Sequence, residues 1–273
     1  MGRTIIVGDV HGCSRELEEL LAYVGFTRDD DLVLVGDLVV RGPNSHAVVQ
    51  LCRKLGARTV RGNHEDRLLR WRASRGTPSE LRISAVTRRA GDDLSAKDWT
   101  YLERMPLWID LPNHSARVVH AGLMPGLAIE QHDPRVLMYV RSLGGRGEAL
   151  EERGARSWSH AYAGPLHVVY GHDAQREPEI AEHATGIDTG AVYGGRLTAM
   201  VLREGETVPP PAERRSVLVS VPARKAYFIR DSRPSRTGAE FGHARSGAPV
   251  RLDEPPSSGA SESAALGEAE RGE

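Results

Sequence analysis

The sequence predicts an α/β fold with a parallel sheet, and three observations support that prediction. Short runs at 4–7 and 32–35 are typical of buried strands, and 58–61 is expected to form a third strand. Each run leads into a glycine-flanked polar motif, with Asp37 28 residues after Asp9 and Asn63 26 residues after Asp37. Helical periodicity fills the intervals between the runs. This spacing is typical of successive βαβ units, whose strand ends lie along one edge of a sheet.

Two amphipathic helices are expected between the three strands. The first begins at Ser14, carries Glu16 where the helix dipole favours an acid, and ends at Gly25. The second spans about 44–55, and another helix begins near residue 68. The apolar positions that recur at helical spacing in the first two are Leu17, Leu20, Leu21, Val24, Val48, Leu51, Cys52 and Leu55.

A polar, arginine-rich stretch follows, and the pattern predicts a helical insertion over about 75–105 that caps the site. Ser95 and Asp98 have the spacing of a capping box at the start of a helix. The second half then contains further strand-like runs separated by Gly/Pro turns, at 107–111, 116–119, 166–170, 197–202, 217–221 and 226–229. The runs after residue 186 are expected to form a second, mixed or antiparallel sheet.

The composition limits the functions that the chain can have. It has 273 residues with a net charge of −1, so no general basic field favours DNA binding. Two cysteines, no room for a signal peptide before the first strand and no membrane-length apolar run predict a cytoplasmic protein without a membrane partner. We expect one domain over 1–230 and a disordered tail over 231–273, rich in Ser, Gly, Pro and charge. The sequence carries no signal for an oligomeric state.

The side chains at the strand ends suggest metal chemistry. They are Asp9, His11, Asp37, Asn63, His64, His120 and His172. Mixed carboxylate, imidazole and amide oxygen donors suit Mn²⁺, Fe²⁺, Co²⁺ or Zn²⁺ rather than Ca²⁺. A carboxylate between two histidine-containing sets can bridge two ions, which typically lie roughly 3.5–4 Å apart and activate water for attack on phosphorus. A single histidine after a strand is usually structural, but five such turns in one chain make that interpretation improbable.

These motifs, in this order, resemble the signature of calcineurin-like metallophosphoesterases of the phosphoprotein-phosphatase type. The segments are Gly8-Asp9-Val10-His11-Gly12, Gly36-Asp37-Leu38-Val39-Val40-Arg41-Gly42, Gly62-Asn63-His64-Glu65, His120-Ala121-Gly122 and Gly171-His172. The resemblance covers about 3–202. It implies a four-layer α/β/β/α sandwich of two mixed sheets, with a dinuclear metal site at the strand ends.

The resemblance also implies a role for each motif residue. Asp9 and His11 would bind the first metal ion, and Asp37 would bridge the two ions. Asn63, His120 and His172 would bind the second ion. His64 would protonate the leaving oxygen, and Arg41 would hold the phosphate. Mn²⁺ is the expected metal, with Co²⁺, Fe²⁺ and Zn²⁺ as alternatives.

One position departs from the pattern of protein Ser/Thr phosphatases. Val40 stands where those enzymes have a second aspartate that pairs with the catalytic histidine. Without that carboxylate His64 should be less basic and a weaker proton donor. Departure of a serine alkoxide needs strong acid catalysis, whereas departure of a nucleoside phosphate needs much less. The substitution therefore favours cleavage of phosphoanhydrides.

The uncharged residue is also a mark of the ApaH-like branch, which includes symmetrical diadenosine tetraphosphate hydrolases and related phosphatases. Segments 170–176, 186–199 and 138–142 resemble that branch. They suggest Arg141 as a second phosphate clamp, since its planar fork binds phosphate oxygens in pairs. Arg176 and Tyr193 could contact adenine or the outer phosphates, although a surface salt bridge and core packing explain them equally well.

The sequence is therefore interpreted as a metallophosphoesterase that cleaves diadenosine tetraphosphate symmetrically into two ADP, with a metal-bridging hydroxide as the nucleophile. A protein phosphatase of the same branch and a hydrolase of polyphosphate or capped RNA are the alternatives with the same site. A metal-binding or nucleotide-sensing protein without turnover would be favoured by a missing ligand or a missing His64, and neither is missing.

Overall fold

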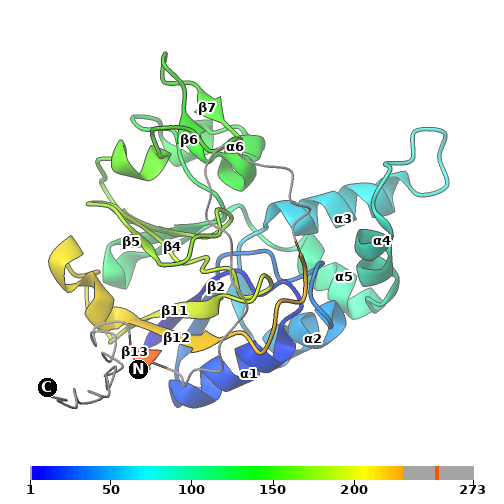
Figure 1. Ribbon diagram of the computed structural model, residues 1–273, viewed down its shortest axis with the longest axis horizontal. Helices are drawn as coiled ribbons and strands as arrows, with labels where there is room; N and C mark the ends of the chain where they lie inside the picture. The colour runs from blue at the N-terminus through cyan, green and yellow to red at the C-terminus, as the bar shows by residue number, and fades with distance from the viewer. Residues whose placement is uncertain (1, 230–249, 252–273) are drawn as a thin grey trace, which may run out of the picture.

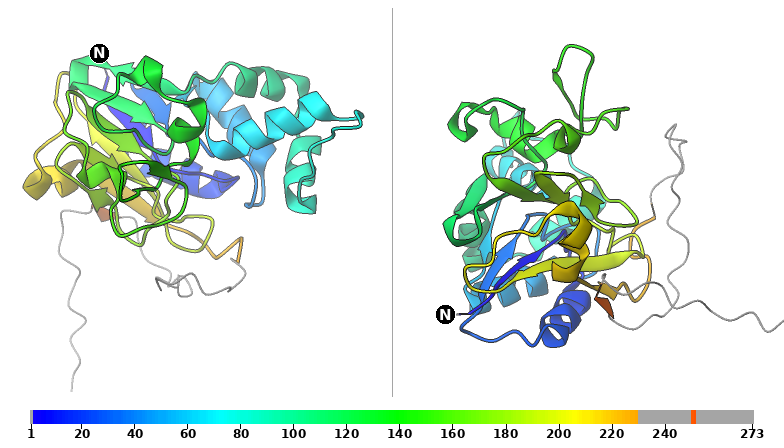
Figure 2. Two further views of the ribbon diagram at one scale, coloured as in Figure 1. Left: turned by 90° about the horizontal axis from the view of Figure 1, so that it is seen from above. Right: turned by 90° about the vertical axis from the view of Figure 1, so that its left-hand side faces the viewer.

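The computed structural model describes residues 2–229 and 250–251 (Figure 1). The tail predicted to be disordered over 231–273 lies outside the described residues, apart from the short strand at 250–251. The chain forms two sheets stacked face to face, with helices on the outer faces (Figures 1 and 2).

The first sheet contains the three predicted parallel strands and three later ones. Its order is β13 (Val250–Arg251), β12 (Leu218–Pro222), β11 (Arg196–Leu202), β1 (Thr4–Val7), β2 (Asp31–Leu34) and β3 (Arg58–Thr59). β1, β2 and β3 are parallel, whereas β11 pairs antiparallel with β1 and β12 with β11. The prediction that 197–202 and 217–221 belong to the second sheet is therefore wrong. β11 covers the free edge of β1, which would otherwise expose unpaired backbone groups.

The second sheet is built from the middle of the chain. Its order is β4 (Trp108–Leu111), β5 (Ala116–Val119), β8 (His167–Tyr170), β10 (Ala184–Gly186) and β9 (Glu179–Ile180). β5, β8 and β10 are parallel, and the two outer pairs are antiparallel. A small hairpin, β6 (Ser142–Leu143) and β7 (Ala149–Leu150), stands apart from both sheets. Residues 226–229, predicted as a strand, form a single bridge between Ala226 and Tyr193 instead.

The helices lie largely where periodicity predicts them. They are α1 (Ser14–Tyr23), α2 (Ser45–Leu55), α3 (Asn63–Ser74), α4 (Ala85–Asp92), α5 (Ala96–Glu103) and α6 (Pro134–Tyr139), with short 3₁₀ helices η1 (Pro112–His114), η2 (Ile129–Gln131), η3 (Trp158–His160) and η4 (Pro211–Val217). Asn44 caps α2 by accepting the N–H of Ala47, and Gly56 ends that helix with φ 71°. The predicted capping box at Ser95 and Asp98 starts α5. Insertion helices α4 and α5 contact α3, and α5 also contacts α2, so their capping of the site stays a prediction.

Alternating burial along the strands shows the layering. Ile5 and Val7 pack beneath the first sheet with the apolar faces of α1 and α2, whereas Ile6 faces the other sheet. In the second sheet Val118 faces that shared layer and Val119 faces outward. Three separate cores therefore lie between four layers, as expected for an α/β/β/α sandwich.

Candidate dinuclear metal centre

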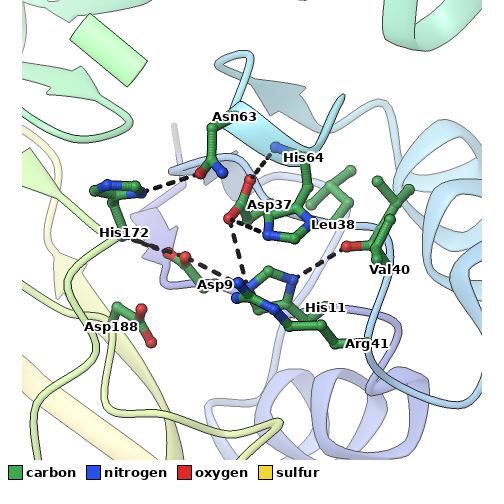
Figure 3. A network of polar contacts seen from close by, with 12 residues as sticks. Asp9, His11, Asp37, Leu38, Val40, Arg41, Asn63, His64, His172 and Asp188 are labelled. Atoms are coloured by element: carbon green, nitrogen blue, oxygen red, sulfur yellow. Dashed lines mark hydrogen bonds and ion pairs between the residues drawn. The ribbon is translucent and has the colours of Figure 1, made fainter. Parts of the chain in front are cut away.

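The carboxyl ends of five strands in the two sheets meet at one place, and all seven predicted site side chains gather there. Figure 3 labels all of them except His120. Asp9 and His11 follow β1, and Asp37 follows β2. Asn63 and His64 open α3 just after β3. His120 and His172 follow β5 and β8 of the second sheet. The site therefore exists only when the two sheets are stacked.

Two groups of side chains at this place have the geometry to hold a metal ion. One consists of His11, Asp37 and His64, and the other of Asp37, His120 and His172. Within each group the ligand atoms lie within 4.8 Å of one another. Asp37 belongs to both groups, since its Oδ2 lies 3.5 Å from Nε2 of His11 and its Oδ1 lies 3.5 Å from Nε2 of His120.

The other two predicted ligands border these groups. Asp9 is buried, and its Oδ2 lies 4.0 Å from Nε2 of His11. The backbone N–H of His172 donates to both Asp9 oxygens at 3.2 Å. Asn63 presents its Oδ1 2.9 Å from Nε2 of His120 and 3.0 Å from Nδ1 of His172. Each therefore offers oxygen next to imidazole nitrogen.

The imidazoles are oriented so that one nitrogen of each faces the centre as an acceptor. The other nitrogen must donate its proton, because its partner is a carbonyl oxygen. These partners are Val39 for His11 (3.1 Å), Val35 for His120 (2.8 Å) and Tyr139 for His172 (3.2 Å). The lone pairs of His120, His172 and Asn63 thus point at one another without a proton between them, which is the arrangement that a cation stabilises.

Two motif glycines are explained by close approach to the carboxylates. A Cβ on Gly62 would lie 2.3 Å from Oδ1 of Asp37, and a Cβ on Gly171 would lie 1.9 Å from Oδ1 of Asp9. Both distances are far below van der Waals contact. The absence of a side chain at these positions is therefore required by the donor geometry.

The loop after β2 is held in an unusual backbone conformation. Asp37, Val40 and Arg41 have φ of 49°, 71° and 69°, a region that residues other than glycine rarely adopt. Glu65, which is fully buried, stabilises the loop by accepting the N–H groups of Asp37 (2.9 Å) and Leu38 (2.8 Å), and it also accepts those of Val39 and Gly62. Glu65 directly follows His64 in the third motif, and this position is the sequence signal for its role at the site.

The electrostatics of the centre favour the binding of cations. Burial, and next the charge of Asp188, raises the pKa of Asp9 well above its ordinary value. Burial likewise raises the pKa of Asp37 and of Glu65 to about 7. Burial lowers the pKa of His120 to about 4, so this imidazole is neutral and cannot compensate the acids. The donor set therefore fits divalent cations, which would compensate these carboxylates.

The surroundings of His64 agree with the expectation that it is less basic, because Val40 stands in place of an aspartate partner. Its Nδ1 is buried without a hydrogen-bond partner among the described residues. Burial, together with the nearby His11, lowers its pKa well below the ordinary histidine value. Its Nε2 lies 4.0 Å from Oδ2 of Asp37. The side chain thus faces the metal groups but lacks the carboxylate that would raise its basicity.

The three predicted arginines and Tyr193 lie in two places, the metal centre and a cavity next to it. Arg41 reaches the centre, with Nη1 3.0 Å from Nε2 of His11, and its guanidinium lies 5.5 Å from the centre of the Tyr193 ring. Tyr193 is buried, so the structure places it against Arg41 rather than open to a ligand. Arg141 and Arg176 line a separate cavity of about 620 Å³.

That cavity adjoins the centre through Asp173, which follows His172 directly. Asp173 accepts Nε–H bonds from both Arg141 (3.2 Å) and Arg153 (2.6 Å). Sequence reasoning missed Arg153 and Asp173, because nothing in the local pattern shows that the two arginines converge. Asp188 accepts the N–H of Gly190 at 3.0 Å.

Histidines outside the motifs belong to neither donor group among the described residues. His114, for example, links the carbonyl of Glu206 to the hydroxyl of Thr4 at 2.7 Å each. His243 lies outside the described residues.

Comparison with known proteins identifies close relatives of the chain. The sequence pattern of the calcineurin-like phosphoesterase family matches residues 2–176. The asymmetrical bis(5'-nucleosyl)-tetraphosphatase PrpE of Oceanobacillus iheyensis is 32% identical over 227 residues, which cover 74% of this chain and 90% of that protein. The protein of the same name from Bacillus cereus is 30% identical over 230 residues, covering 76% and 93%.

Solved structures agree with the fold. A crystal structure described as that of a candidate diadenosine tetraphosphatase is 36% identical, with a TM-score of 0.70, and covers 81% of this chain and 94% of its own. A protein serine/threonine phosphatase of Saccharomyces cerevisiae, 15% identical with a TM-score of 0.51, covers 85% and 81% and shares the fold alone. In the part of the chain that the structure describes, no helix has the length and apolarity to cross a membrane.

Proposed function

We propose that this chain, which belongs to the calcineurin-like phosphoesterase family, is a metal-dependent hydrolase that cleaves a phosphoanhydride bond of diadenosine tetraphosphate. The observation that carries the proposal is the pair of donor groups that share Asp37 where the two sheets meet. The names of the bacterial relatives support the substrate class.

The motif residues would bind the two metal ions in the way that the resemblance implies. Two divalent ions, when bound, supply an activated water and neutralise phosphate charge. Asp9 and His11 would hold one ion, Asp37 would contact both, and the second would be held by Asn63, His120 and His172. Their buried, correctly oriented lone pairs support this assignment. Mn²⁺ is the metal that we expect.

Two arginines would position the phosphate chain. Arg41 extends from the strained loop into the centre and would bind the oxygens of the phosphate under attack. Arg141 lies in the adjoining cavity with Arg176, where the remaining phosphates and the distal nucleoside could extend. Tyr193, which is buried, would act on the substrate through Arg41 rather than by direct contact.

The state of His64 favours anhydride cleavage over hydrolysis of alkyl phosphate esters. Its low basicity and unpartnered Nδ1 make it a modest proton donor for the leaving oxygen. A nucleoside phosphate leaves as a weak base and needs only modest help, whereas a serine alkoxide needs a strong general acid.

The sequence and the names of the relatives give different predictions for which phosphoanhydride bond is cleaved. The resemblance to the ApaH-like branch predicts symmetrical cleavage into two ADP. The relatives carry the word asymmetrical in their names, so we propose cleavage into ATP and AMP for this chain.

Product analysis tests the proposal directly. The protein loaded with Mn²⁺ is incubated with diadenosine tetraphosphate in ¹⁸O-labelled water. The nucleotides are then separated, quantified and analysed by mass spectrometry. We expect equal amounts of ATP and AMP, with ¹⁸O in one of them only. Two ADP would restore the symmetrical prediction, because they require cleavage of the central anhydride instead of the one next to it.

Variants and competing substrates complete this test. His64→Ala should lower turnover on the order of 10²-fold or more. His183→Ala is the matched control, because that half-buried histidine belongs to neither donor group and does not line the adjoining cavity, so turnover should stay at the wild-type rate. Efficient hydrolysis of phosphotyrosine or phosphoserine peptides, with little anhydride cleavage, would reject the tetraphosphatase in favour of a phosphatase.

A further inference from the structure

The last described segment before residue 230 returns to the candidate metal centre, although it lies beyond the match to the family pattern, which ends at residue 176. We call residues 223–229 the C-terminal strap. It follows β12 and runs beside α1, in orange in Figure 1. Its path brings Phe228 to within reach of Arg41.

The strap is anchored on one side by a buried acid. Glu16 of α1 is fully buried, and its Oε1 accepts the N–H of Arg224 at 3.0 Å and the hydroxyl of Tyr227 at 2.8 Å. The sequence suggested only that Glu16 is an acid in the first turn of the helix, where the helix dipole favours it. Its burial instead ties the strap to the helix that follows the first motif.

A second anchor joins the strap to the loop that carries Tyr193. The N–H groups of Tyr227 and Phe228 donate to the carbonyl of Val192 at 2.9 and 3.0 Å. Ala226 forms the backbone bridge to Tyr193. These contacts set the two aromatic side chains next to each other.

The paired rings form a contact surface for Arg41. Tyr193 and Phe228 meet edge to face, with centroids 6.3 Å apart and planes at 71°. The guanidinium carbon of Arg41 lies 5.5 Å from the Tyr193 centroid and 5.8 Å from the Phe228 centroid. Both distances fall in the range of cation–π attraction. Phe228 is half-buried, so its ring completes the contact without being sealed in the core.

Arg41 needs such support because its polar contact with His11 competes with metal binding. Its Nη1 lies 3.0 Å from Nε2 of His11, the nitrogen whose lone pair faces the centre. A metal ion on that nitrogen would displace the guanidinium from it, whereas the two ring contacts would persist. A long arginine side chain is otherwise flexible, and ordering it costs rotamer entropy.

We propose that the C-terminal strap positions Arg41 for phosphate binding by closing Phe228 and Tyr193 against its guanidinium. Phe228 is thus a positioning residue that acts on the substrate through Arg41. This inference rests on the proposed function, in which Arg41 binds the phosphate under attack.

A double-mutant cycle with inorganic phosphate as competitive inhibitor tests the coupling. In the Mn²⁺-loaded protein, Phe228→Ala should raise the inhibition constant of phosphate and the KM for diadenosine tetraphosphate about 3- to 10-fold, the size expected for loss of one cation–π contact. Phe228→Leu should behave alike, since it keeps apolar bulk but has no ring, and Phe228→Trp should stay near wild type. In an Arg41→Ala background Phe228→Ala should add nothing.

Ile229→Ala is the matched control, because this neighbour on the strap is 84% exposed. A readout independent of turnover is the NMR signal of the Arg41 Nε–H, measured with diamagnetic Zn²⁺ in place of Mn²⁺. Ring currents from Phe228 should shift it, and the shift should be lost in the Ala and Leu variants and kept in the Trp variant.

The outcomes separate the inference from the proposed function. Wild-type phosphate inhibition in Phe228→Leu, or additive effects of the Phe228 and Arg41 changes, would overturn the positioning role while leaving the hydrolase intact. An Arg41→Ala protein with unchanged KM and phosphate inhibition would instead remove Arg41 from phosphate binding, and with it the basis of both statements.

Discussion

Asp37 and Asp98 are both buried carboxylates that lie close to histidine, but the protein treats their charges in opposite ways. Asp98 is fully buried and accepts hydrogen bonds from Arg53 (2.7 Å) and His46 (2.8 Å), as well as from Ser95. Burial alone would raise the pKa of Asp98, but the hydrogen bonds from Ser95, Arg53 and His46 outweigh it and lower the pKa.

At Asp37 the balance is reversed. Burial raises its pKa to about 7, and the N–H of His64 and the charge of Arg41 offset only part of that effect. Asp9 and Glu65 add further carboxylates to the same place, and burial lowers the pKa of His120 to about 4, so this imidazole is neutral. The Asp98 cluster contains its own cation, Arg53, whereas the donor atoms around Asp37 fit a bound metal ion. The comparison separates a structural ion pair from a candidate metal site.

The largest expected effect comes from removing the shared carboxylate. Asp37→Asn should lower kcat/KM for diadenosine tetraphosphate on the order of 10³-fold, which corresponds to an activation free energy about 4 kcal/mol higher. Mn²⁺ should raise the melting temperature of the wild type above that of the chelated protein, and the rise should be smaller in Asp37→Asn. An undiminished Mn²⁺ effect together with full activity would show that Asp37 is not a ligand.

The opposite experiment breaks the structural cluster. Asp98→Ala should reduce the free energy of unfolding by ~3 kcal/mol, because it leaves Arg53 and Ser95 without their acceptor. The melting temperature should fall by about 6–12 °C. The response to Mn²⁺ and the kcat/KM of the folded protein should stay at wild-type values. Loss of the Mn²⁺ response would mean that the two clusters are not independent.

A carboxylate introduced next to His64 tests whether a charged partner would make this histidine a better general acid. Val40→Asp should offer an acceptor to the unpartnered Nδ1 of His64 and make it a better acid. Aspartate also tolerates the left-handed conformation at this position better than valine does. The ratio of alkyl phosphomonoester to anhydride hydrolysis should rise about tenfold. An unchanged ratio would contradict the leaving-group argument.

The smallest effect is expected at an intermediate case, the pair of Asp30 and Arg3. Hydrogen bonding to Arg3 lowers the pKa of Asp30 to about 2, despite its burial. A folded pKa below the unfolded value means that the stabilisation is complete above about pH 4 and is lost as the pH falls toward 2. Asp30→Asn should therefore cost about 1–2 kcal/mol at pH 7, and urea unfolding should show this difference shrinking between pH 4 and pH 3. Thr27→Ala, which leaves the Arg3 contact intact, is the control.

Much of the candidate site could be predicted because its residues lie in short motifs directly after strands. In a parallel sheet such positions share an edge, so Asp9, Asp37 and Asn63 had to be neighbours once the three strands were recognised. His120 and His172 follow the same rule in the second sheet. The roles of Arg153 and Phe228 could not be predicted, since each depends on a contact with a distant segment.

The sequence by itself determined the local structure and the donor set. Apolar runs, helix caps and glycines specify the strands, the helices and the turns that present Asp37 and its neighbours, because these choices depend on a few adjacent residues. The tertiary structure alone decided that β11 and β12 join the first sheet and that the C-terminal strap returns to Arg41. Both outcomes depend on contacts between segments that lie far apart in the chain, and no short stretch of sequence contains that information.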